Sequence, residues 1–273
     1  ALRYSPLSRG LGDVYNRQVK YRYLEVEKTP EPDVAPDWAH APLRLGPETI
    51  ASRFARSFGA AVHAALSRWQ RAVDSGGRRS SDRLMALVRG EAMAALLPET
   101  EIDRALRRLD PGLRAYAQGP WPRHATIFLE QPVRHRLLAP DGFAVDLHLR
   151  VDRVTRYRRS VAIIDFKTVT PHALEMRADR WQLLTYALAA PDLLGVAPST
   201  LHLVVIDLLS GSEHAVSPDR VALETAAGDL LRGARGIAAG QFDIGREHQD
   251  RPCWSCGFRL TCPASLAPKP PAR

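Results

Sequence analysis

The stretch RVDRVTRYRRSVAIIDFKTV, residues 150–169, contains an apolar run that ends in an acid and an amine. The run at 161–164 has the length and composition of a buried strand, and Asp165, Phe166 and Lys167 follow it directly. Side chains alternate across a strand, so Asp165 and Lys167 share one face while Phe166 points to the other. We therefore expect a carboxylate and an amine side by side where a buried strand ends.

The residues before this strand supply a second carboxylate. If residues 150–157 and 160–167 form a hairpin that turns at 158–159, Asp152 lies directly opposite Asp165. Directly opposed Cβ atoms on one face are about 4.5–5.5 Å apart. Like charges at that distance repel unless a cation lies between them. A hard divalent cation is the natural occupant, because Mg²⁺ favours one or two carboxylates together with phosphate oxygens.

Lys167 beside such a metal is suited to hold a phosphate or to orient an attacking water. The alternative interpretation is structural: Asp165 and Lys167 are charges on an edge strand, and Asp152 pairs with Arg150 or Arg153. Strand alternation also places Arg150 on the face of Asp152, together with Val154 and Arg156, so Arg150 and Arg156 are expected to flank the metal.

The rest of the chain reads as helices and strands in a mixed order. Apolar residues at helical spacing and short apolar runs predict the following elements: helices at 47–69, 81–96 and 100–117, strands at 126–137, 143–157 and 160–168, a helix at 173–190, a strand at 201–208 and a helix at 218–239. This order predicts a mixed α/β fold, with a central sheet flanked by helices.

Composition narrows the class of protein. The chain has 273 residues, of which 45% are hydrophobic, and its formal net charge is +8. Such a charge suits a polyanionic partner such as nucleic acid, although a solvated basic surface gives the same number. No run of about 18 apolar residues is present, so no membrane partner is expected. The first ten residues lack a signal-peptide apolar region, which predicts a cytoplasmic protein.

Four segments resemble elements of the PD-(D/E)XK nuclease superfamily, in particular its RecB-like branch (AddB-type and CRISPR-associated exonucleases), and they occur in family order. FGAAVHAAL resembles the helix with a metal-binding histidine, here His63. LRVDRV resembles the GRIDRI strand, with Leu149 in place of the usual glycine. IIDFKT is similar to IIDYKT. WQLLTYALA resembles the Q-x-x-x-Y helix and supplies Gln182 and Tyr186.

The resemblance implies a restriction-endonuclease-like core over residues 47–245, with a helical insertion at about 76–120. It also implies which residues work in the site. The implied metal ligands for Mg²⁺ or Mn²⁺ are His63, Asp152, Asp165 and the backbone carbonyl of Phe166. The implied catalytic residues are Asp152, Asp165 and Lys167, where Lys167 positions or deprotonates the attacking water. The implied substrate-binding residues are Gln182 and Tyr186, and Arg150 joins them on the strand argument above.

Glu130, in the strand segment TIFLEQPV, is one more carboxylate near the start of the sheet. A supporting role in the site and a solvated strand position are equally compatible with the sequence.

Three cysteines lie close together near the end of the chain. Cys253, Cys256 and Cys262 have C-x2-C-x5-C spacing, which suits one soft metal centre better than a disulfide framework. The spacing resembles part of the iron–sulfur staple of the same nucleases, but the fourth cysteine is missing and Tyr15 stands in its place. A cluster with another fourth ligand, a zinc site completed by His248, and a metal-free remnant all remain open.

The staple resemblance implies three units along the chain. Residues 1–46 are expected to pack against the cysteine lobe, residues 47–245 to form the core, and residues 246–273 to hold the cysteine motif and a disordered Pro-rich tail. The expected function is a metal-dependent DNA nuclease, an exonuclease acting on single-stranded or end-bearing DNA in repair, recombination or defence.

Two other classes of protein remain as alternatives. One is a noncatalytic DNA-binding scaffold subunit that retains the nuclease fold, and the other is a metal-stabilised module that docks a partner protein. The chain has no G-x-x-x-x-G-K-[ST] phosphate loop, so unwinding would require a separate helicase or complex.

Overall fold

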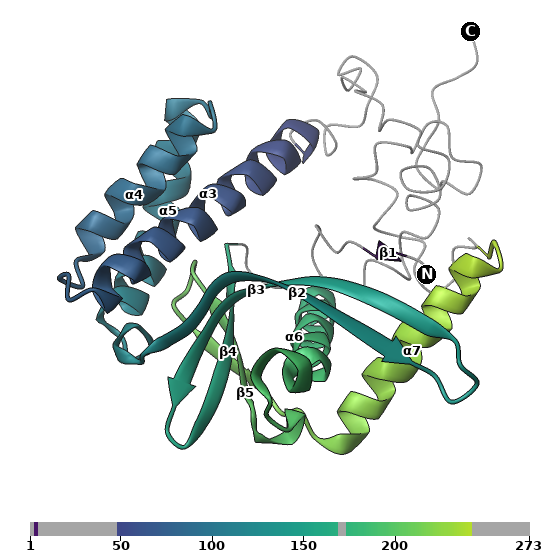
Figure 1. Ribbon diagram of the computed structural model, residues 1–273. Helices are drawn as coiled ribbons and strands as arrows, with labels where there is room; N and C mark the ends of the chain where they lie inside the picture. Colours follow the sequence, from purple (N-terminus) through teal and green to yellow (C-terminus); the bar gives the residue numbers. More distant parts are fainter. Residues whose placement is uncertain (1–2, 5–47, 169–172, 242–273) are drawn as a thin grey trace, which may run out of the picture.

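The computed structural model describes residues 3–4, 48–168 and 173–241 (Figure 1). The predicted N-terminal segment, apart from Arg3–Tyr4, and the cysteine motif, with Cys253, Cys256 and Cys262, lie outside these residues. The helices are α3 (Glu48–Asp74), α4 (Ser81–Ala94), α5 (Glu99–Gln118), α6 (Ala173–Leu194) and α7 (Arg220–Ala238), with short 3₁₀ turns η2 (Trp121–Arg123) and η3 (Pro198–Thr200). Among the described residues, no helix is long and apolar enough to cross a membrane.

One mixed sheet carries the fold. Its strands are β1 (Arg3–Tyr4), β2 (Thr126–Leu138), β3 (Ala144–Tyr157), β4 (Ser160–Lys167), β5 (His202–Asp207) and β6 (Glu213–Val216). Their order is β1-β3-β4-β5-β6, and β2 also pairs with β3. The β2–β3, β3–β4 and β5–β6 pairs are antiparallel, whereas β4–β5 and β1–β3 are parallel. The predicted mixed α/β fold, a central sheet flanked by helices, is confirmed.

The predicted hairpin register is confirmed. Arg153 pairs with Ile164, Val154 with Ile163 and Tyr157 with Ser160, so the turn falls at residues 158–159. Arg158 has a φ of 53°, which lies in the left-handed region that tight hairpin turns require. The turn therefore forms without the Asn-Gly sequence that usually favours it.

Two apolar cores lie on opposite faces of the sheet. The first lies between α3–α5 and the side chains of Ala162, Ile164 and Phe166 on β4, continued by alternate residues of β5. The second lies between α6–α7 and the opposite side chains, including Ile163. Because β4 is buried on both faces, its residues form a continuous apolar run instead of an alternating one.

The helical unit α3–α5 approaches the sheet very closely at one glycine. A Cβ atom on Gly112 of α5 would lie 2.0 Å from the backbone oxygen of Leu208, just after β5. Such a distance is impossible for a real side chain, so a glycine is required where α5 crosses the end of this strand. The contact brings the predicted helical insertion directly against the sheet.

The expected alternation along β3 is wrong beyond Asp152. Val151 and Val154 both pack in the core beneath α6, so the side chains of Asp152 and Arg153 both point toward α3–α5. The cause lies in the paired strand, where Glu130 has a φ of 50° between two regular pairs. Arg150 precedes this break and shares the face of Asp152, as predicted, whereas the register places Arg156 on the opposite face.

The remaining differences from the predicted elements are small. Strand β6 and the two-residue strand β1 were not predicted, because each is too short to show a period. Helices α3 and α6 extend about one turn beyond their predicted C-terminal ends.

Candidate active site

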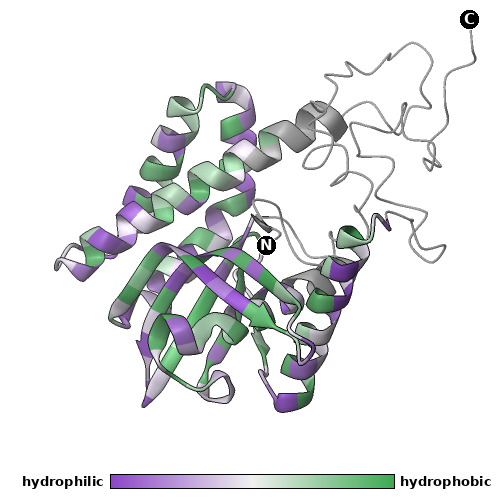
Figure 2. Ribbon diagram, turned by 45° about the vertical axis from the view of Figure 1, so that its right-hand side comes forward, coloured by the Kyte–Doolittle hydropathy of each residue, from purple (hydrophilic) through white to green (hydrophobic). Residues whose placement is uncertain are grey.

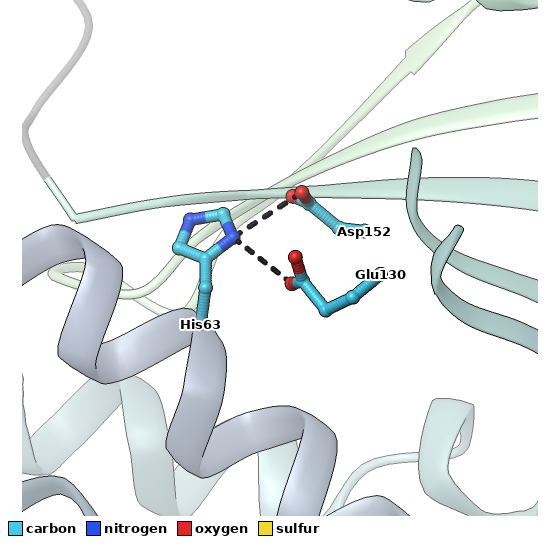
Figure 3. A group of neighbouring side chains, drawn as sticks. All are labelled: His63, Glu130 and Asp152. Carbon is cyan, nitrogen blue, oxygen red and sulfur yellow. Dashed lines mark ion pairs between the residues drawn. The ribbon is translucent and has the colours of Figure 1, made fainter. Parts of the chain in front are cut away.

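The first half of the site is a histidine between two carboxylates. His63 of α3 places its Nδ1 atom 3.2 Å from Oδ1 of Asp152 and 3.6 Å from Oε1 of Glu130 (Figure 3). The three side chains come from α3, β2 and β3. Their exposed fractions are 26% for His63, 17% for Glu130 and 9% for Asp152. Solvent therefore reaches the group in part, and mainly at His63.

Backbone conformation brings Glu130 into this group. Its positive φ interrupts β2 between the pairs Leu129–Arg153 and Gln131–Val151. A non-glycine residue in this region costs free energy, and such residues cluster at functional sites. The second carboxylate oxygen of Glu130 lies 2.9 Å from Nε of Arg150, so the glutamate is held between a histidine and an arginine.

The electrostatics of this half are those of a cation site. Burial lowers the pKa of His63, but the charges of Asp152 and Glu130 outweigh it and raise that pKa well above its ordinary value. Burial raises the pKa of the Asp152 carboxyl, but the facing His63 and the N–H of Phe166 outweigh burial and lower that pKa. In the metal-free protein, a protonated histidine therefore supplies the positive charge that the carboxylates require.

The second half of the site contains the acid and the amine. Lys167 Nζ lies 2.8 Å from Oδ2 of Asp165 and donates to Oε1 of Gln182 at 2.8 Å. Gln182 Nε2 in turn donates to Oδ1 of Asp165 at 2.8 Å. The three side chains thus form a closed ring of interactions between β4 and α6. The predicted proximity of Asp165 and Lys167, and of both to Gln182, is observed.

Tyr186 supports this ring from the next turn of α6. Gln182 Nε2 also lies 2.6 Å from the Tyr186 hydroxyl, which donates to the backbone oxygen of Arg150 at 2.7 Å. The side chain of Tyr186 is buried, so the phenol ties α6 to β3. Burial, with the Asp165 carboxylate nearby, raises the pKa of this phenol well above 10 and keeps it a donor.

Among the acids of the site, Asp165 has the most strongly shifted pKa. Burial raises its pKa to about 6, the neighbouring Lys167 opposes this rise, and the Asp152 charge adds to it. Desolvation and a like-charged neighbour favour the protonated acid, which a bound cation would reverse. A buried acid with this pKa beside a second carboxylate is typical of functional sites.

One hydrogen bond joins the two halves. Oδ2 of Asp152 accepts from the backbone N–H of Phe166 at 2.9 Å, so Asp152 touches His63 through one oxygen and β4 through the other. Asp152 is therefore the residue common to both halves. The neighbouring backbone carbonyl of Phe166 remains a predicted ligand.

The residues present fit a hard divalent cation. One ligand atom from each of His63, Glu130 and Asp152 lies within 4.8 Å of the other two. Carboxylate oxygens and a neutral imidazole are suitable donors for Mn²⁺, and carboxylates for Mg²⁺. Asp165 is turned toward Lys167 and is not in this group, so the set contains Glu130 where the sequence predicted Asp165.

The alternative interpretation of the sequence made Arg153 a possible ion-pair partner of Asp152, but the structure gives this arginine another role. Its side chain is fully buried and donates to the backbone oxygens of Trp121 and His124 and to the hydroxyls of Tyr116 and Thr126. All of these acceptors are neutral. No local sequence pattern distinguishes this buried arginine from an exposed arginine on the same strand.

Comparison with known proteins agrees with this geometry. A solved structure described as "Crystal structure of SSO0001" is similar at 18% identity and a TM-score of 0.40, over 75% of this chain and 85% of that chain; this is too distant to carry an argument. No curated protein matches. The family model of the PD-(D/E)XK nuclease superfamily matches residues 37–263, which include every residue of the site. The chain therefore belongs to the PD-(D/E)XK nuclease superfamily, whose members are metal-dependent nucleases.

Proposed function

We propose that the protein is an exonuclease that hydrolyses phosphodiester bonds in single-stranded or end-bearing DNA with Mg²⁺ or Mn²⁺. The observation that carries the proposal is the Asp165–Lys167–Gln182 ring joined through Asp152 to the His63–Glu130 pair. A purely structural ion pair would not require a second acid, a histidine and a glutamate in a left-handed backbone conformation beside it.

The proposed metal ligands are His63, Asp152 and Asp165, with the Phe166 carbonyl, and the observed geometry adds Glu130. Asp152 is central, because one of its carboxylate oxygens contacts His63 and the other accepts from the N–H of Phe166. A bound divalent ion supplies a water of lowered pKa and neutralises the scissile phosphate.

Lys167 is proposed to hold the attacking water, or to take up its proton. Its Nζ atom is fixed between Asp165 Oδ2 and Gln182 Oε1, so the lysine needs little reorganisation before it acts. Gln182 and Tyr186 have a holding role in this arrangement, because they fix Asp165, Lys167 and β3 relative to one another.

Arg150 is proposed to bind a phosphate of the substrate. Its side chain is 62% exposed and its guanidinium lies against Glu130 at the entrance to the site. An exposed guanidinium beside a metal site suits a phosphate group, to whose two oxygens it can donate two parallel hydrogen bonds.

The setting of the reaction is also part of the proposal. DNA repair, recombination and defence each need a nuclease that works from an end, and a separate helicase or repair or defence complex would supply unwinding. The cysteine motif is proposed to hold an iron–sulfur cluster, or zinc, with a structural role.

The test is digestion of end-labelled single- and double-stranded DNA by wild-type protein, Lys167→Ala and Asp152→Asn, with Mg²⁺, Mn²⁺ or EDTA. Asp110→Asn serves as a matched acid-to-amide control, since Asp110 lies on α5 and forms an ion pair with Arg114 at 2.7 Å. We expect metal-dependent cutting by the wild type and the control, and a loss of about 10³-fold or more in both site variants.

The product ladder gives polarity and distinguishes end-dependent from internal cutting. DNA binding without cutting under every metal would contradict the proposal and favour the noncatalytic scaffold. Cutting that survives in Lys167→Ala would remove the lysine from the mechanism while leaving the nuclease intact.

A further inference from the structure

Among the described residues, helices cover only one face of the hairpin end of the β2–β3 ribbon, and we call the other face the open face (Figure 1). Below the ribbon lie α6 and α7, and none of the described helices lies above it (Figure 1). Val133, Leu147 and Leu149 point down into the core, and His135 points the same way, with its Nδ1 2.7 Å from Asp192 of α6. The residues between them therefore point up, and hydrophilic positions alternate with hydrophobic ones along the ribbon (Figure 2).

The open face is basic. Arg134 pairs across the ribbon with His148, Arg136 with Asp146, and Pro132 with Arg150. The three arginines are exposed, at 66% for Arg136 and 62% for Arg150. Two acids offset part of this charge: Asp146 lies 3.7 Å from Arg136, and Glu130 lies 2.9 Å from Arg150. Within the described part of the chain, Arg134 has neither an ion pair nor a side-chain hydrogen bond.

This face leads straight into the candidate active site. Arg150 contacts Glu130, which contacts His63, and Asp152 is two residues further along β3. From Asp152 to the position of Arg136, opposite Asp146, is six residues of strand, or about 20 Å. The cations thus form a continuous row that ends at the proposed metal ligands.

We propose that this row, Arg134, Arg136, His148 and Arg150, is a track that holds the phosphate backbone of one DNA strand and feeds it to the site. The inference rests on the proposed function and names the form of its substrate. The two columns of side chains are about 5 Å apart, the spacing of neighbouring strands. A single backbone fits this width, whereas the backbones of a duplex are separated by grooves of about 6 and 12 Å.

Salt dependence measures the track directly. Each phosphate neutralised on a single strand contributes about −0.7 to the slope of log K against log salt. Removal of two arginine contacts is expected to make that slope less steep by about 1.4. At about 0.1 M salt, the corresponding loss of affinity is roughly 10- to 30-fold.

The experiment compares the wild type with Arg134→Gln/Arg136→Gln by fluorescence anisotropy. The probe is oligo(dT) of about 16 nucleotides, with EDTA present and salt varied from about 50 to 300 mM. The matched control is Arg107→Gln/Arg108→Gln, which removes the same charge from exposed arginines of α5. We expect the smaller slope and weaker binding only in the ribbon variant, with a smaller change for a duplex of the same length.

Three results would overturn the track: equal slopes in the ribbon variant and the wild type, equal losses in the ribbon and α5 variants, or a loss on duplex as large as that on oligo(dT). Wild-type hydrolysis of bis(p-nitrophenyl) phosphate with Mn²⁺ tests the proposed function separately, because this small diester is too short to occupy the ribbon. Failure of that hydrolysis would count against the nuclease, whereas the binding slopes would still decide whether the track exists.

Discussion

Arg150 and Arg153 are three residues apart on β3, yet the structure gives them opposite surroundings. Arg150 is 62% exposed and contacts one carboxylate, that of Glu130. Arg153 is fully buried and makes five hydrogen bonds to neutral oxygens from the η2 turn, α5 and the start of β2. A buried guanidinium is tolerated only when its donors are satisfied in this way.

The difference shows how one strand serves two purposes. The irregularity at Glu130 turns consecutive side chains of β3 to the same side, so Asp152 reaches the metal site while Arg153 anchors the helical unit. Arg153 also reaches further: the Tyr116 hydroxyl that it bonds lies 3.5 Å from Gln70, which donates to Asp74. Residues toward α5 should therefore govern stability, and residues toward the open face should govern catalysis.

The largest expected effect is that of Arg153→Ala on folding. The substitution leaves backbone oxygens of Trp121 and His124 buried without their donors, so the free energy of unfolding should fall by about 3–5 kcal/mol. Denaturant unfolding followed by circular dichroism measures this. Arg153→Lys should recover only a part, because an ammonium cannot reproduce the planar fork. A loss below about 1 kcal/mol would contradict the anchoring role.

Gly112→Ala should weaken the same boundary by about 2–3 kcal/mol, because its Cβ would meet the Leu208 backbone oxygen at 2.0 Å. Gly90→Ala is the matched control in the neighbouring helix α4. A Cβ there meets nothing within 4 Å, so that change should stabilise the protein by about 0.5–1 kcal/mol. Thermal unfolding of the two variants side by side would show equal shifts only if the close approach were absent.

Arg150→Ala should have the opposite effect to Arg153→Ala, with a loss of activity and almost no loss of stability. We expect the free energy of unfolding to change by no more than about 0.5 kcal/mol, because the pair with Glu130 is exposed on the arginine side. The value of kcat/KM on DNA should fall about tenfold, or about 1.4 kcal/mol of transition-state binding. Steady-state digestion and denaturant unfolding of the same preparation test both halves. An unstable but fully active variant would contradict this division of roles.

The smallest expected effect is a dependence of metal stabilisation on pH. The raised pKa of His63 means that its contribution to stability is complete below its ordinary value of 6.5 and is lost as pH rises through the raised value. The contribution of Asp165 is complete below 3.8 and is lost as pH rises through about 6. Asp152, whose pKa is lowered, contributes fully above 3.8 and is constant in this window.

The metal-free protein should therefore lose stability from pH 3.8 to about 6 through Asp165, and again as pH rises from 6.5 through the raised pKa of His63. Added Mn²⁺ should raise Tm by a few degrees more at pH 8 than at pH 5, because the cation then competes with fewer protons. Differential scanning calorimetry in Mn²⁺ and in EDTA gives the comparison. Asp152→Asn should flatten it, and equal Mn²⁺ shifts at both pH values in the wild type would contradict the assigned groups.

Most of the fold was predictable, because its elements carry strong periods. The run before Asp165 and the spacing back to Asp152 predicted the β3–β4 register, and the structure confirms it by pairing Tyr157 with Ser160 across a two-residue turn. The lysine side of the site followed from the same alternation. It depends on neighbouring residues of one strand and on residues of α6 spaced one turn apart.

The rest depends on backbone geometry that no residue pattern encodes. The left-handed φ of Glu130 shifts the alternation of β3, puts the glutamate beside His63 and turns Arg153 inward. Side chains alternate with a period of two only where both strands are regular. Arg156 was therefore predicted on the wrong face, and the role of Glu130 stayed undecided. A glutamate in a strand gives no warning of an αL conformation, which tertiary contacts impose.

The backbone amide of Phe166 donates to the carboxylate of Asp152. Its proton chemical shift and its rate of exchange with deuterium therefore depend on the state of Asp152. Binding of a cation, protonation of the acid, or arrival of a phosphate would each change the electron density that this hydrogen meets. A single ¹⁵N-labelled phenylalanine resonance at the end of β4 would thus act as an internal spectroscopic gauge of the active site, without any substitution or attached dye.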